Sequence, residues 1–84
     1  MRDLDAALSI FRCPATGRHV TRVDAATVER LNDAVEQGRL ETLDGEPVER
    51  PLEAALQPED TDFAYPVRGG IPDFRLDQRV PLEV

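Results

Sequence analysis

The sequence predicts a small α+β domain in which an antiparallel sheet of three or four strands packs against two helices. Residues 24–38 carry a helix pattern with a capping residue at each end. Phe63, Tyr65 and Val67 alternate with other residues at the period of a strand that buries one face. Between these segments, residues 58–61 (Pro-Glu-Asp-Thr) form a turn cluster, which predicts that two strands join in a hairpin.

The size and charge of the chain limit what it can do. A hydrophobic content of 40% over 84 residues predicts one domain, residues 1–84, with a modest core. The net charge is −7 and no basic patch is present, so direct nucleic-acid binding is not expected. Neither an export leader nor a run of about 18 apolar residues is found, so we expect a cytoplasmic protein without membrane contact.

The first helix is expected to begin at Asp3, which can act as an N-cap. Leu4, Leu8 and Phe11 would share one face of this short amphipathic helix. The Cys-Pro pair at residues 13–14 ends the helix, because a residue before proline avoids the helical region.

A turn at residues 15–17 leads into the first expected strand, residues 18–23, which is rich in β-favouring side chains. Asp24 is the expected N-cap of the second helix, and Gly38 stands where a left-handed residue ends a helix. The inward stripe of this helix has three members: Val28, Leu31 and Val35.

The middle of the chain is less regular. Residues 40–48 are expected to form a weak strand, interrupted by the Asp-Gly turn signal at residues 44–45. Residues 46–51 are polar and contain two prolines, which favours a connecting loop. Residues 52–57 could form a helical turn on propensity alone, but a strand is preferred because the turn cluster follows directly.

The C-terminal segment is predicted to turn tightly and leave in an extended conformation. Gly69 and Gly70 supply positive φ angles, and Pro72 biases Ile71 towards an extended backbone. The tail, residues 75–84, could dock through three apolar residues or fray. Those residues are Leu76, Val80 and Leu82.

Two segments at opposite ends of the chain resemble one family. Residues 4–17 (Leu-Asp-Ala-Ala-Leu-Ser-Ile-Phe-Arg-Cys-Pro-Ala-Thr-Gly) resemble the opening helix and Cys-Pro-x-Cys-x-Gly knuckle of Trm112-like proteins. Residues 65–72 (Tyr-Pro-Val-Arg-Gly-Gly-Ile-Pro) resemble their closing Tyr-Pro-[Ile/Val]-x-[Asp/Gly]-Gly-Ile-Pro motif. The middle of the chain, with the helix expected from Asp24, matches only as an insertion between the ribbon strands.

The resemblance implies a zinc-ribbon-like antiparallel sheet and a non-catalytic role. Characterised members bind and stabilise S-adenosylmethionine-dependent methyltransferases, covering an apolar patch and extending the enzyme's sheet. In this sequence the zinc-binding cysteines are degenerate, since Thr16 stands at the second Cys position and the second ligand pair is absent. Cys13 and His19 supply two of the four ligands that zinc needs, or half a site shared across a dimer. We therefore expect no metal and no cofactor, with Cys13 a lone remnant packed as a small hydrophobe.

The apolar segment around the glycine pair is the candidate site. We expect a partner-binding patch made of six residues: Tyr65, Pro66, Gly70, Ile71, Pro72 and Phe74. The alternative is that Ile71 and Phe74 close the core under the first helix. No catalytic residue is expected, because the dipole at the end of a helix disfavours a Cys13 thiolate. A self-associating structural protein, a homodimer through the same patch, is the alternative from another class.

Overall fold

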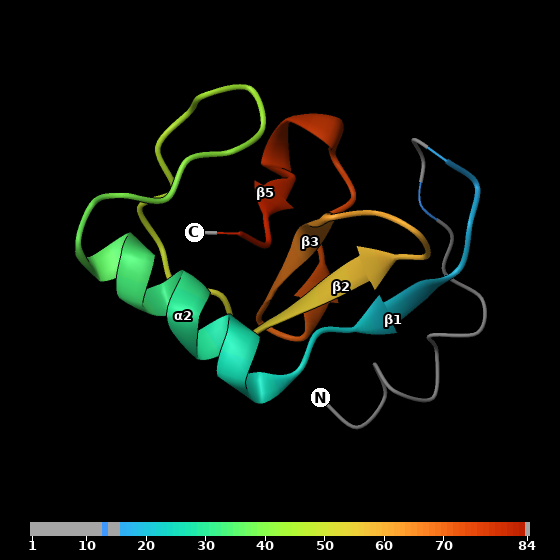
Figure 1. Cartoon of the computed structure of the whole chain (residues 1–84), viewed down its shortest axis with the longest axis horizontal. Helices are drawn as coiled ribbons and strands as arrows, with labels where there is room; N and C mark the ends of the chain where they lie inside the picture. Colours follow the sequence, from blue (N-terminus) through green and yellow to red (C-terminus); the bar gives the residue numbers. More distant parts are fainter. Residues whose placement is uncertain (1–12, 14–15, 84) are drawn as a thin grey trace.

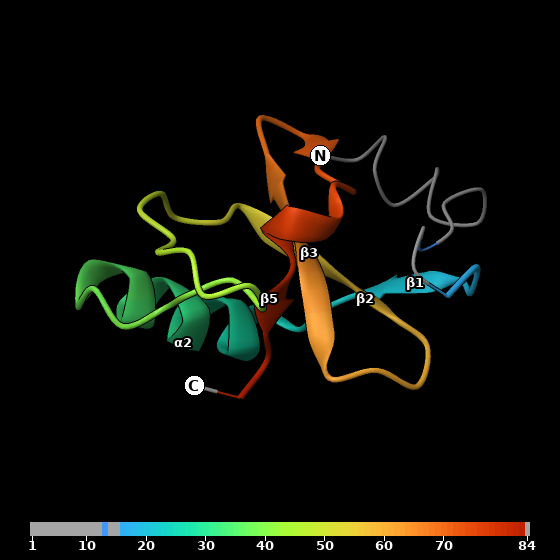
Figure 2. The same cartoon turned by 90° about the horizontal axis from the view of Figure 1, so that it is seen from above.

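The computed structural model describes Cys13 and residues 16–83, and in this part of the chain one α-helix packs on a curled sheet (Figures 1 and 2). The elements, in order, are β1 (Val20–Arg22), α2 (Ala25–Glu36), β2 (Ala54–Pro58), β3 (Phe63–Arg68), β4 (Ile71–Pro72), the 3-10 helix η2 (Leu76–Gln78) and β5 (Val80–Pro81). The predicted α+β class is confirmed. The expected first helix, with Asp3, Leu4, Leu8 and Phe11, lies outside the described residues.

The sheet is antiparallel throughout, with the order β1-β2-β3-β4 and with β5 paired to β3. The predicted hairpin is confirmed, because Leu56 of β2 lies opposite Tyr65 of β3. The far edge of β3 is shared by two short strands: Val67 faces Pro72 of β4, and Ala64 faces Val80 of β5. The tail therefore docks as a fifth strand rather than fraying.

Pro66 lies in the middle of β3, where proline is normally excluded because it donates no ladder hydrogen bond. The Pro66 carbonyl accepts a hydrogen bond of 2.9 Å from the Asp73 amide, just beyond the end of β4. The nitrogen and carbonyl of one strand residue point to the same side, so the nitrogen of Pro66 also faces this edge. At this position the partner of β3 changes from β4 to β5. Because no strand residue faces Pro66 there as an acceptor, its missing N–H costs the sheet little stability.

Helix α2 has the predicted ends. Asp24 is extended, at φ −65° and ψ 155°, and its carboxylate accepts a 2.6 Å hydrogen bond from the Thr27 hydroxyl instead of a backbone amide. Gly38 follows the helix with φ +69°. Leu31 and Ala34 are fully buried, while Val28 and Val35 are half-buried. The inward face is therefore centred on Leu31, as the sequence predicted.

The core has two parts, one on each face of the central strands. The α2 face contains eight buried residues: Val23, Leu31, Ala34, Leu40, Leu52, Ala55, Ala64 and Val80. The opposite face, called the Tyr65 face, contains six buried residues: Cys13, Val20, Ala54, Leu56, Tyr65 and Val67. Phe63 and Phe74 are partly buried and pack against them. The prediction that β3 buries only one face is wrong, because α2 and β5 cover the small residues between its large ones.

The segment between α2 and β2 contains little regular structure and is anchored by tertiary hydrogen bonds. The weak strand expected at residues 40–48 is reduced to an isolated bridge between Glu41 and Pro47. The loop is anchored to α2 where the Asn32 amide donates to the Leu52 carbonyl at 2.9 Å and accepts from the Leu52 amide at 2.7 Å. This pair of hydrogen bonds sets where the chain enters β2.

Candidate protein-binding site

The turn between β3 and β4 is held by hydrogen bonds to a neighbouring strand. Arg68 and Ile71 face each other across a two-residue loop, and Gly69 and Gly70 have φ angles of +61° and +75°, as a type I′ turn requires. The backbone amides of both glycines donate hydrogen bonds to the Glu53 carboxylate. The turn is therefore fixed to the beginning of β2, and Ile71 projects from a defined position.

The six predicted patch residues divide into exposed and buried groups. Ile71 is 71% exposed and Gly70 is exposed, whereas Pro72 and Phe74 are partly buried. Tyr65 and Pro66 are buried, so the expectation that they form an exposed surface is wrong. Phe74 packs its ring against Tyr65 with centroids 5.1 Å apart, and thus belongs to the core. The apolar surface of this segment is centred on Ile71.

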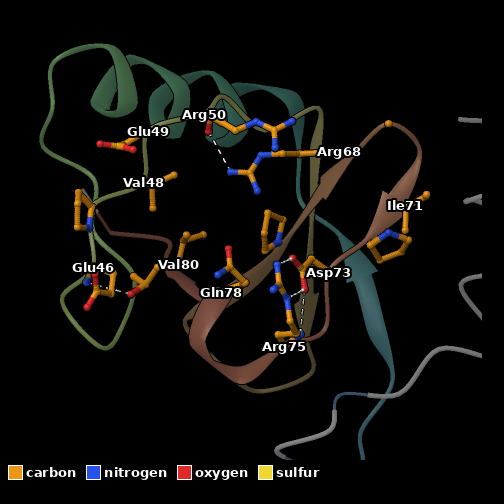
Figure 3. A pocket seen from close by; sticks show the side chains of 15 residues that line it. Glu46, Val48, Glu49, Arg50, Arg68, Ile71, Asp73, Arg75, Gln78 and Val80 are labelled. Carbon is orange, nitrogen blue, oxygen red and sulfur yellow. Dashed lines mark hydrogen bonds and ion pairs between the residues drawn. The ribbon is translucent and has the colours of Figure 1, made fainter.

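An open groove of about 680 Å³ lies between the loop at residues 42–50 and the β3–β4 hairpin (Figure 3). Its accessible apolar lining includes Pro47, Val48 and Pro72, and Ile71 stands at its edge. No local pattern predicts this groove, because it forms between two segments that are separated in the sequence.

Charged side chains line the groove in two arrangements. Asp73 and Arg75 form an ion pair with hydrogen bonds of 2.6 and 2.9 Å, which lowers the pKa of Asp73 and raises that of Arg75. Arg68 donates to the carbonyls of Pro51 and Arg50 at 3.2 and 3.0 Å. Burial, followed by the nearby positive charge of Arg50, lowers the pKa of Arg68.

The structure describes three of the residues that the expected knuckle and its ligands involve: Cys13, Thr16 and His19. Cys13 is 1% exposed, as predicted, and its Sγ lies 3.1 Å from the Tyr65 hydroxyl. Thr16, at the second Cys position, accepts a 3.2 Å hydrogen bond from the Arg18 amide. His19 is exposed. In the described part of the chain, no three His, Cys, Asp or Glu residues are grouped to hold a metal ion.

Comparison with known proteins identifies a shared fold. The chain matches no protein-family model and no curated protein. Among solved structures it is similar to the solution NMR structure of XF2673 from Xylella fastidiosa, with a TM-score of 0.71 and 21% identity. The match covers 92% of this chain and 79% of that chain. Within the described residues, no helix has the length and apolar character needed to cross a membrane.

Proposed function

We propose that this chain is a non-catalytic protein-binding subunit of the cytoplasm, a metal-free relative of the Trm112-like proteins whose partner is an S-adenosylmethionine-dependent methyltransferase. The observation that supports the proposal is Ile71, the most exposed large hydrophobic residue among those described. It stands on a turn held by two hydrogen bonds, and it continues into the apolar side chains of Val48 and Pro72 in the groove, so that together they offer a partner an apolar surface.

The geometry of β4 favours contact through side chains over sheet extension. The Asp73 amide points to β3, so the backbone of the preceding residue, Pro72, points away from the sheet. Proline offers no N–H there, and β4 is a poor template for a partner strand. We therefore expect the partner to bury Ile71 in an apolar pocket of its own.

The test is a matched pair of variants, Ile71→Asp and Leu43→Asp. Leu43 is also an exposed large hydrophobic, 45% exposed, but it does not line the groove. The free energy of unfolding of both variants should lie within about 0.5 kcal/mol of the wild-type value, because neither side chain is in the core. Tagged wild-type and L43D chains should recover a methyltransferase from their own cell lysate, whereas Ile71→Asp should lose about 30-fold in affinity for it.

Other outcomes would contradict the proposal. Equal recovery by both variants would show that Ile71 is not the contact. Recovery of the chain alone, as a dimer that Ile71→Asp dissociates, would favour the self-associating structural protein. Marked unfolding of Ile71→Asp would mean that Ile71 serves the fold.

A further inference from the structure

Arg50 and Arg68 form a pair of guanidinium groups at one end of the groove. Figure 3 shows them side by side, and both line the groove and a second, smaller hollow next to it. Arg68 is fixed by its hydrogen bonds to two backbone carbonyls, which still leaves several of its N–H groups without a partner in the described structure. In that part of the chain, the Arg50 side chain forms no hydrogen bond or ion pair.

Two of the carboxylates that line these hollows are engaged by other groups. Glu53 lines the smaller hollow, but its two oxygens accept hydrogen bonds from Gly69 and Gly70. Asp73 lines the groove, but Arg75 holds both of its oxygens. In a chain with 17 acidic residues, two adjacent arginines thus have no carboxylate of their own among the described residues. Like charges repel each other, so this arrangement favours an incoming anion.

We propose that Arg50 and Arg68 bind a carboxylate of an extended acidic segment of the partner protein, whose apolar side chains lie along the groove towards Ile71. This inference rests on the proposed function and specifies the chemistry of the partner. Guanidinium groups match a carboxylate through paired N–H···O bonds, and such bonds are stronger between charged groups. The apolar lining would take the neighbouring side chains of the same peptide.

The shape and charge of the groove favour a peptide over other anions. A groove of about 680 Å³ is far larger than one carboxylate, and the accessible side chains of Val48, Ile71 and Pro72 suit apolar residues of a longer ligand. A nucleic acid would bring many phosphates against Glu46 and Glu49, which also line the groove, and against a net charge of −7. A peptide with one acidic residue between apolar ones brings a single negative charge, which the two arginines can pair, and apolar side chains for the rest of the lining.

The experiment is selection of a random nonapeptide display library on the folded full-length chain, followed by binding measurements with the selected peptide. Selected peptides should carry Asp or Glu next to apolar residues. Arg50→Gln should weaken binding about tenfold, and so should exchange of the peptide's acidic residue for its amide. Arg30→Gln is the matched control, because Arg30 lies exposed on α2 and should bind as the wild type does. Arg68→Gln is secondary, since it also loses backbone hydrogen bonds.

Several results would overturn this site. The selection could yield no peptide, or only peptides without an acidic residue. Arg50→Gln and Arg30→Gln could lose the same affinity for the peptide. Acetate or hexauridine could displace the bound peptide as effectively as unlabelled peptide does. Acidic peptides selected while the lysate yields no partner would keep the site and remove the proposed function. A partner that needs Ile71 but tolerates Arg50→Gln would remove this site alone.

Discussion

The two faces of the central sheet are built from different materials. On the α2 face, three fully buried alanines, Ala34, Ala55 and Ala64, let the helix approach the strands closely. On the Tyr65 face the contacts are aromatic, with Tyr65 edge-to-face against Phe63 and Phe74 at centroid separations of 6.0 and 5.1 Å. One face holds a helix by close aliphatic packing, and the other holds the extended arm by its rings.

The difference matters for the candidate site. The extended arm is the segment of residues 71–74. Phe74 anchors its far end on the Tyr65 face, and the Glu53 carboxylate holds the turn at its near end. Ile71 lies between these two anchors and remains exposed. The Tyr65 face thus supports the proposed contact surface, whereas the α2 face holds the helix. Three substitutions separate these roles.

Leu31→Ala should have the largest effect, because it empties the centre of the α2 face. Leu31 is completely buried, and removal of a buried leucine side chain loses transfer free energy and leaves a cavity. We expect the free energy of unfolding to fall by about 3 to 4 kcal/mol, measured by urea titration with circular dichroism. Val28→Ala, at a half-buried position of the same helix, should cost about 1 kcal/mol. Equal losses of unfolding free energy in Leu31→Ala and Val28→Ala would show that the α2 face is not centred on Leu31.

Sequence reasoning identified the elements that local chemistry determines. The caps at Asp24 and Gly38 and the glycine turn depend only on neighbouring residues, and all have their predicted positions. The burial of both faces of β3 was not predicted, because Ala64 and Pro66 are small or non-bulky residues that are also common on the exposed face of an amphipathic strand.

The candidate site could be predicted only in part for the same kind of reason. The exposed Ile71 follows from its turn, whereas the burial of Tyr65 depends on what packs over it. The Arg50–Arg68 pair depends on the path of the loop above the sheet, and this path is determined by tertiary hydrogen bonds that no local pattern encodes.

Asn32→Ala should have the next largest effect, at the rim of the α2 face. Its side chain both donates to and accepts from the backbone of Leu52, and its loss leaves two partly buried backbone groups unpaired. We expect a loss of about 2 kcal/mol of unfolding free energy in the same titration. Asn32→Asp should cost at least as much at neutral pH, because its carboxylate would face the Leu52 carbonyl. An Asn32→Ala variant with the stability of the wild type would show that water replaces these hydrogen bonds at no cost in stability.

Tyr65→Phe should have the smallest effect and tests whether the Tyr65 face depends on more than ring packing. The substitution keeps both edge-to-face contacts and removes the hydroxyl that lies 3.1 Å from the Cys13 sulfur. A thiol is a weak hydrogen-bonding group, so we expect a loss of about 1 kcal/mol. A double-mutant cycle with Cys13→Ala isolates the interaction of the pair from the cavity that the alanine leaves, and should give a coupling energy of about 0.5 kcal/mol. A coupling energy of zero would mean that the sulfur and the hydroxyl lie close together without stabilising each other. The Tyr65–Cys13 contact would then contribute through packing, and the polar anchoring of the core would lie on the α2 side, at Asn32.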